Sequence, residues 1–339
     1  MKSNARFILS KSKVIDQYTK IKNHSNIVSY SYKTNFDVGN ILKSQTKCMF
    51  SVHSIKSVDM LDSPDRIWYF AQGWDKKDIL NLLDNGVTKF VVDNITDLNI
   101  LLNNIKNNKI ELLLRMKLQE HTIHTGKHFV YGLYSKQINE LLPKLKLNKN
   151  ITKLGIHFHR KTQNVSEWNL LEELQDSIKH WDLIDCINIG GGFPSVYKNF
   201  RANMFTNIFD KVEKLKLWLN SKNIKMIIEP GRFIAAPSVK LEAYIINKYD
   251  KNLVIDCSVF NAALDTWISH IRLLVENELE SGDSYTIKGQ TPDSADILRY
   301  KVHLKNPKIG EKITFLNAGA YNFATDFCNL PKIPTIIID

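Results

Sequence analysis

The 339-residue sequence predicts an α/β protein, a (β/α)₈ TIM barrel followed by a C-terminal β-sandwich or β-barrel domain. Two observations predict this fold class. Eight short aliphatic runs alternate with stretches whose apolar residues recur at helical spacing, and each helix of such a series must pack back on the sheet that it left. Near residue 236 this alternation stops, and extended segments then follow one another with little helix between them.

The first observation is the series of apolar runs, each bounded by polar or turn residues. The runs cover residues 27–32, 48–53, 66–71, 89–93, 110–116, 153–158, 186–190 and 225–229. Leu170, Leu171, Leu174 and Ile178 illustrate the helical spacing of the stretches between them. An open doubly wound sheet would show the same alternation, but a count of eight strands favours a closed barrel.

The second observation is the change of pattern after the barrel. Extended segments at 241–249, 251–259, 284–288, 300–304 and 312–316 predict an antiparallel β domain. A short apolar segment at 5–10 precedes the barrel, and we expect it to join this domain. The expected domains are therefore a cofactor-binding barrel at 11–236 and a C-terminal β domain at 237–339.

Composition and charge narrow the class of protein. The formal net charge is +11, but the lysines are scattered and form no basic block, so we expect a solvated surface and no nucleic-acid partner. The four cysteines lack metal-ligand spacing, which predicts no metal site and reduced thiols in a cytoplasmic protein. The sequence shows no signal peptide and no apolar run long enough to span a bilayer, so we expect no membrane association.

Reactive side chains follow several predicted strands, where barrel enzymes build their active sites. Lys33 follows the first strand, His159 the sixth, the glycines at 190–192 the seventh and Glu229 the eighth, with Arg232 close behind. Taken singly, such residues are commonly ordinary surface or core residues. Together they provide an amine, an imidazole, an acid, a glycine cradle and an arginine, which are the groups that pyridoxal phosphate requires. The sequence has neither the dinucleotide-binding glycine motif after the first strand nor a P-loop.

Six motifs, in the same order along the chain, resemble segments of the fold type III pyridoxal-phosphate-dependent decarboxylases, which include ornithine, arginine, lysine and diaminopimelate decarboxylases. The motifs are Ser31-Tyr32-Lys33-Thr34-Asn35, His157-Phe158-His159, Ile189-Gly190-Gly191-Gly192-Phe193-Pro194, Glu229-Pro230-Gly231-Arg232, Gly289-Gln290-Thr291-Pro292-Asp293-Ser294-Ala295-Asp296 and Gly319-Ala320-Tyr321. The resemblance runs through most of the chain. It implies an alanine racemase-like barrel with pyridoxal 5'-phosphate as the cofactor.

The resemblance also implies roles for individual residues. Lys33 would carry the cofactor, His159 would stack on its ring, and Glu229 would face the pyridine nitrogen. Asp293 would recognise a distal amine of the substrate from across a homodimer interface, so that two subunits share each active site. The other implied cofactor ligands are Thr162, Gly190, Gly191, Gly192, Gly231, Arg232 and Tyr321, and the implied substrate residues besides Asp293 are Ser269 and Tyr321.

Several positions depart from the pattern of that family. Pro292 stands where the family usually places a cysteine that helps protonate the carbanion, and proline cannot fill that role. Ser51 occupies a place where ornithine-type enzymes often have Asp, and Thr162 takes the place of a serine. Ser269 falls where ornithine-type enzymes carry a carboxylate for the distal amine of the substrate. These departures leave both the proton donor and the substrate open.

The expected function is therefore pyridoxal-phosphate-dependent decarboxylation of a small basic amino acid, of the ornithine, lysine or arginine type, to a polyamine or a polyamine precursor. Decarboxylation of diaminopimelate, carboxynorspermidine or a siderophore precursor is an alternative that Ser269 keeps open. A catalytically silent homologue that regulates polyamine metabolism is an alternative of another class, against which the intact set of reactive residues argues. Amino-acid racemisation is disfavoured by the motifs that contain Asp293 and Tyr321.

Overall fold

The computed structural model describes residues 3–118, 131–201 and 207–339. It divides into two compact units. The barrel unit comprises Tyr18–Pro194 and Phe205–Gly231, and the β unit comprises Met1–Gln17, Ser195–Met204 and Arg232–Asp339. None of the helices in the described part of the chain is long and apolar enough to cross a membrane.

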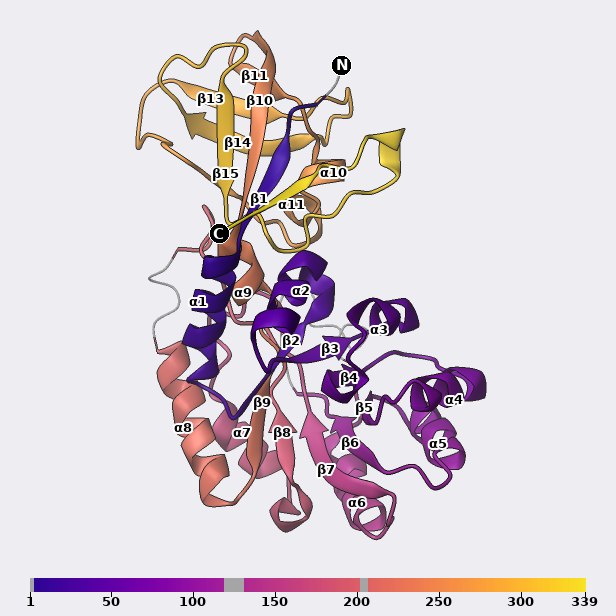
Figure 1. The fold of residues 1–339 in the computed structure, drawn as a ribbon. Helices are drawn as coiled ribbons and strands as arrows, with labels where there is room; N and C mark the ends of the chain where they lie inside the picture. Colours follow the sequence, from indigo (N-terminus) through magenta and orange to yellow (C-terminus); the bar gives the residue numbers. More distant parts are fainter. Residues whose placement is uncertain (1–2, 119–130, 202–206) are drawn as a thin grey trace. The chain divides into compact units, whose positions relative to one another are not determined.

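The barrel unit contains a closed barrel of eight parallel strands, as the alternating pattern predicts (Figure 1). Its strands are β2 (Ile27–Ser31), β3 (Met49–Val52), β4 (Ile67–Tyr69), β5 (Lys89–Val92), β6 (Ile110–Arg115), β7 (Ile151–His157), β8 (Cys186–Asn188) and β9 (Lys225–Ile228). The register pairs Ile27 with Ile227, so that the last strand hydrogen-bonds to the first and the barrel leaves no open edge. The predicted (β/α)₈ fold class is confirmed.

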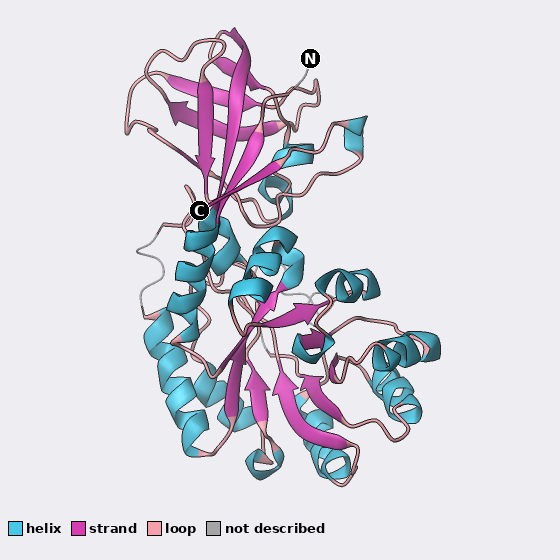
Figure 2. Ribbon diagram, in the orientation of Figure 1, coloured by secondary structure: helices cyan, strands magenta, loops and turns pink. Residues whose placement is uncertain are grey.

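One helix precedes the first barrel strand, and the others follow barrel strands and lie around the barrel (Figure 2). They are α1 (Lys11–Lys22), α2 (Phe36–Gln45), α3 (Ile55–Leu61), α4 (Lys76–Asp84), α5 (Ile95–Asn104), α6 (Ser135–Lys146), α7 (Leu170–Ser177) and α8 (Ile208–Ser221). Four of them begin at a side chain that accepts a hydrogen bond from the first turn of the helix, which satisfies a backbone N–H without a helical partner. These N-caps are Asn35, Ser54, Asp75 and Asn94.

A layer of apolar side chains fills the barrel toward the amino ends of its strands. Trp68, Val91, Leu113, Cys186 and Ile227 form one buried cluster, and each comes from a different strand. Side chains packed in this way make the barrel interior a solid core and not a channel. The polar residues at the carboxyl ends of the strands therefore lie above a closed apolar floor.

The β unit contains a separate eight-stranded sheet. Its strands are β1 (Arg6–Ser10), β10 (Val239–Tyr249), β11 (Asn252–Ile255), β12 (Leu274–Val275), β13 (Ser284–Lys288), β14 (Ile297–His303), β15 (Lys312–Leu316) and β16 (Thr335–Ile338), and its short helices are α9 (Arg232–Ala235), α10 (Val259–Ala262) and α11 (Asp265–Ile268). Buried and part-exposed residues alternate along most of β10, as expected for a strand with one face on a core.

The prediction of an antiparallel β domain is wrong in part, because this sheet is mixed. β1 pairs antiparallel with β10 but parallel with β16, and β11 pairs parallel with β13. Strand direction is set by the connections between distant segments, so the local alternation of residues could not reveal it.

Candidate active site

Lys33 lies on a tight turn at the carboxyl end of β2. The turn is a single 3₁₀ segment, η1 (Tyr32–Thr34), in which Tyr32 and Thr34 are buried and Lys33 is exposed. The side chain of Asn35 then accepts a hydrogen bond from the backbone N–H of Val38 at 3.2 Å and starts α2. Buried neighbours on both sides and a capped helix hold the backbone of Lys33 in place.

The end of β9 packs closely against this turn. Gly231 has no side chain, and a Cβ atom at this position would collide with the hydroxyl of Thr34 and lie 3.2 Å from the Cβ of Ser31. Glycine is therefore required for the close approach of the two segments. The contact brings the backbone that follows Glu229 against the turn that carries Lys33.

Glu229 follows β9 and is held by side chains from three other strands. Its Oε1 atom accepts hydrogen bonds from Ser51 Oγ at 2.7 Å and from Asn188 Nδ2 at 2.8 Å. Its Oε2 atom lies 3.3 Å from His157 Nε2. Since the proton of Ser51 Oγ points to Glu229, Ser29 Oγ donates to Ser51 Oγ at 2.8 Å. The side chains of four strands thus form one network around the carboxylate of Glu229, which follows a fifth strand.

These contacts determine the charge of Glu229. Burial alone would raise the pKa of this carboxyl group, but the charge of His157 and the hydrogen bonds from His157, Ser51 and Asn188 outweigh burial and hold the pKa well below its usual range. Glu229 is therefore ionised at neutral pH. The sequence identified Glu229, but it gave no role to Asn188, and it named Ser51 only as a departure from the family pattern and His157 only as part of a motif.

His159 lies beyond the end of β7 and contacts the glycine loop. The backbone N–H of Gly191 donates to His159 Nδ1 at 3.1 Å, so the proton of a neutral ring resides on Nε2. Desolvation by the surrounding protein, with the charge of Arg115 acting in the same direction, lowers the pKa of His159 to about 3, although part of the side chain is open to solvent. The ring is therefore neutral at neutral pH.

Carbonyl groups of neighbouring segments lie where side chains of the glycine loop after β8 would be. Gly190 and Gly192 adopt positive φ angles of 68° and 89°. A Cβ atom at Gly190 would collide with a carbonyl of the chain, and at Gly191 or Gly192 it would lie 2.7 Å from the carbonyl oxygen of Glu229 or Lys161. At each of the three positions, a larger residue would therefore collide with a neighbouring carbonyl group. Thr162, also predicted as a cofactor ligand, is exposed in the turn after β7.

The positive charge of Lys33 acts on two histidines at this end of the barrel. Burial and, to a smaller extent, the charge of Lys33 together lower the pKa of His53 to about 4, and the same charge contributes to the lowered pKa of His159. His53 Nδ1 donates to the carbonyl oxygen of Phe70 at 2.8 Å. The ring of Phe70 lies 5.6 Å from His53 and 5.6 Å from His157, with the guanidinium of Arg115 5.1 Å above it.

The β unit holds a second group of predicted residues. Arg232 is buried and makes two hydrogen bonds to the carboxylate of Asp265 and one, of 3.1 Å, to Tyr197 Oη. Its guanidinium lies 5.0 Å from the centre of the Tyr321 ring. The structure thus brings Arg232 and Tyr321 together, and it adds Asp265 and Tyr197, which the sequence did not single out.

The remaining predicted residues lie in two other loops of the β unit. The carboxylate of Asp293 accepts a hydrogen bond from the backbone N–H of Ala295 at 2.8 Å and is half-buried. Pro292 beside it is exposed. Ser269 ends α11 and is half-buried, and its backbone N–H donates to the carbonyl oxygen of Asp265.

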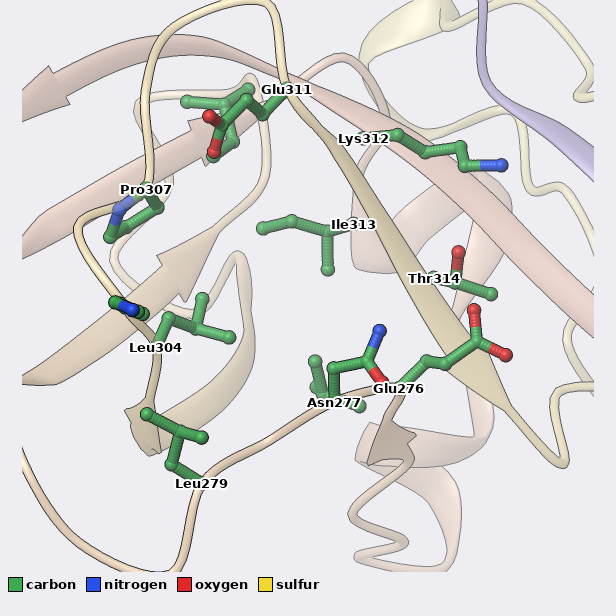
Figure 3. A pocket seen from close by; sticks show the side chains of 12 residues that line it. Glu276, Asn277, Leu279, Leu304, Pro307, Glu311, Lys312, Ile313 and Thr314 are labelled. Atoms are coloured by element: carbon green, nitrogen blue, oxygen red, sulfur yellow. The ribbon is translucent and has the colours of Figure 1, made fainter.

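Two pockets lie apart from the predicted residues. A pocket of about 400 Å³ in the β unit is lined by residues such as Ile313, Leu304, Glu276 and Glu311 (Figure 3). A second pocket, of about 350 Å³, lies at the amino ends of the barrel strands, opposite the end that carries Lys33. No predicted site residue lines either pocket.

The chemistry of the barrel groups fits pyridoxal phosphate. A primary amine, an ionised carboxylate and a neutral imidazole lie at one end of the barrel, and the loop at 190–192 presents backbone without side chains. An ionised carboxylate can keep a pyridine nitrogen protonated, and a neutral imidazole can lie against an aromatic ring without repelling a nearby cation.

Comparisons with known proteins agree with this chemistry. The family model for the pyridoxal binding domain of pyridoxal-dependent decarboxylases matches residues 17–236. A diaminopimelate decarboxylase from Staphylococcus aureus (strain COL) is 25% identical over 297 residues, which cover 77% of this chain and 68% of the relative. A probable ornithine decarboxylase from Dictyostelium discoideum is 22% identical over 369 residues, which cover 97% of this chain and 78% of the relative.

Solved structures show the same fold. A lysine/ornithine decarboxylase from Vibrio vulnificus, complexed with cadaverine, superposes with a TM-score of 0.83 at 21% identity, covering 99% of this chain and 94% of that protein. The family match spans well over half of the chain and includes Lys33, His159, the glycine loop and Glu229. The chain is thus a member of the pyridoxal-dependent decarboxylases.

Proposed function

We propose that this pyridoxal-dependent decarboxylase acts on a basic amino acid of the ornithine, lysine or arginine type and releases a polyamine or a polyamine precursor. The observation that carries the proposal is the ionised Glu229, held by three side chains at the end of the barrel that also bears Lys33. The Dictyostelium discoideum relative, whose alignment covers 97% of this chain, is a probable ornithine decarboxylase.

Each barrel residue has a role toward the bound cofactor. Pyridoxal phosphate, when bound, accepts the electrons released from the bond between Cα and the carboxylate of the substrate. Lys33 supplies the amine for its covalent attachment. Glu229 holds the proton on the pyridine nitrogen, because a carboxylate with a low pKa does not take up that proton itself. The neutral ring of His159 would lie against the cofactor ring, and the loop at 190–192 would receive the phosphate.

Further cofactor ligands and the domain limits belong to this proposal. Gly231, Arg232 and Tyr321 are assigned to the cofactor by the motifs that resemble the family, and Thr162 is assigned because it takes the place of a serine of the family. We assign cofactor binding to 11–236 and place the β domain at 237–339, joined by the segment at 5–10.

The substrate site is proposed to include Asp293 of a second subunit, with Ser269 and Tyr321. An exposed apolar cluster next to Asp293 supports a homodimer. Trp267, Ile268 and Phe327 are 46%, 66% and 51% exposed, and Trp267 Nε1 donates to the carbonyl oxygen of Ala295. Apolar side chains of this size are costly to leave in water, which favours their burial against another copy.

All four cysteines are free, which suits a reducing, cytoplasmic compartment.

Carbon dioxide release from a panel of amino acids tests the proposal. Purified protein with added pyridoxal phosphate should decarboxylate ornithine, lysine or arginine faster than diaminopimelate or carboxynorspermidine. The Staphylococcus aureus relative makes diaminopimelate the second candidate. Faster release from diaminopimelate would replace the proposed substrate class, and no release from any of the five would contradict catalysis on these substrates.

A further inference from the structure

Asn188 is a buried residue at the end of β8 to which the motifs assign no role. Its side chain is fully shielded from solvent. Nδ2 donates to Glu229 Oε1 at 2.8 Å, and Oδ1 accepts from the backbone N–H of Gly190 at 2.9 Å. A single planar amide therefore bridges the carboxylate and the first residue of the glycine loop.

A backbone hydrogen bond reinforces this bridge. The N–H of Glu229 donates to the carbonyl oxygen of Gly190 at 2.8 Å. Two segments that lie far apart in the sequence are thus joined twice, once through the backbone and once through Asn188. Because the bridge needs a donor on one side and an acceptor on the other, an amide meets both needs while a carboxylate or an aliphatic side chain does not.

We propose that Asn188 is a positioning residue that fixes the carboxylate of Glu229 and the glycine loop at one separation, so that the two can hold the pyridine nitrogen and the phosphate of a single cofactor. This inference rests on the proposed function. Glu229 acts at one end of the cofactor and the glycine loop at the other, so the bridge makes binding at the two ends cooperative. Neutral donors also orient the carboxylate without cancelling its charge.

Ser51 offers a matched comparison for Asn188. Both side chains donate to the same oxygen of Glu229, at 2.7 Å and 2.8 Å, but only Asn188 also binds the loop. Ser51→Ala removes a donor to Glu229 and the acceptor of Ser29, but it leaves the loop untouched. Asn188→Leu, a change to a side chain of the same branched shape, removes the donor and the link to Gly190 together.

The test measures binding of pyridoxal phosphate and of pyridoxal, which lacks the phosphate, to the full chain stripped of cofactor. Equilibrium dialysis gives both dissociation constants, and their ratio reports the phosphate contribution. We expect Ser51→Ala to weaken both ligands and to leave the ratio unchanged. Asn188→Leu should lower the ratio by about tenfold or more, as expected when a buried N–H loses its partner. An unchanged ratio in Asn188→Leu would overturn the inference.

If Asn188→Leu does not fold, a second variant, Asn188→Asp, tests the positioning role. Asn188→Asp places two carboxyl groups side by side, which must share a proton, and the protonated form restores both hydrogen bonds. Relative to wild type, its affinity for pyridoxal phosphate should be close to normal at low pH and should fall as the pH rises. If the role of Asn188 is purely structural, the ratio of the two affinities for pyridoxal phosphate should not change with pH. That result would also overturn the inference. Failure of the wild type itself to bind pyridoxal phosphate would defeat the cofactor assignment, a result distinct from either variant's.

Discussion

The two ends of the barrel hold carboxylates with similar exposure but different partners. Glu229 at the carboxyl end is 11% exposed, and Glu111 at the amino end is 18% exposed. Glu229 is bound by the neutral side chains of Ser51 and Asn188 together with His157. Glu111 instead pairs with lysine, including Lys153 at 3.1 Å, which is 57% exposed.

The difference distinguishes a carboxylate of the candidate site from a carboxylate in a surface ion pair. The lysines at the amino end neutralise Glu111, and such solvated ion pairs contribute little to stability. At the carboxyl end, Oε1 of Glu229 is bound by the neutral donors Ser51 and Asn188, while Oε2 lies 3.3 Å from His157, whose charge also lowers the pKa of Glu229. The type of partner therefore distinguishes the two carboxylates better than their burial does.

The largest expected effect comes from replacing Lys33, and the same replacement of Lys153 at the other end of the barrel is its control. Lys33→Ala should abolish activity and remove the visible absorption band of the covalently attached cofactor, because it removes the amine proposed for the attachment. Borohydride reduction followed by mass spectrometry should find the cofactor on wild type alone. Lys153→Ala, at the solvated end, should retain both the band and the activity. Covalent cofactor on Lys33→Ala would show that the attachment site is wrong.

Neutralising each carboxylate gives the next largest effect. Glu229→Gln should lower kcat about 100-fold or more, the size of loss seen when one preorganised electrostatic group is removed. Glu111→Gln should leave kcat near that of wild type and change the free energy of unfolding by less than ~1 kcal/mol. Steady-state kinetics and urea unfolding measure the two quantities. Equal losses of kcat in both variants would remove the distinction between the ends.

A pH titration of stability gives the smallest effect. The pKa of His53 is lowered from its ordinary 6.5 to about 4 in the folded chain. Its stabilising contribution is therefore complete above the unfolded pKa and is lost as the pH falls from 6.5 toward 4, because the unfolded chain binds the proton first. In this window His53→Gln should reduce the slope of unfolding free energy against pH, by at most ~1.4 kcal/mol per pH unit. Identical slopes for the two apoproteins, measured by urea unfolding, would contradict a lowered pKa.

Local sequence patterns predicted most of the fold. All eight barrel strands lie within two or three residues of the predicted runs, because short aliphatic segments bounded by polar residues have few other ways to bury their side chains. The direction of pairing in the β unit was not predictable, as β11 and β13 show, since parallel pairing depends on the path of the intervening chain.

Some residues of the candidate site were also predictable from the sequence, and others were not. Lys33, His159 and Glu229 were found because they follow strands, and the carboxyl ends of all barrel strands face one side. Asn188 and Asp265 carried no such signal. An asparagine before a glycine loop and an aspartate in a short helix are unremarkable in sequence, and their importance comes from the partners that they contact.

The sequence by itself determined which segments become strands and which reactive residue types stand at their ends, since both depend on near neighbours in the chain. Only the tertiary structure decided that Ser51, Asn188 and His157 converge on Glu229, across separations of 178, 41 and 72 residues. Closure of the barrel brings these positions together. A hydrogen bond depends on the final separation of two atoms, which no local pattern of residues encodes.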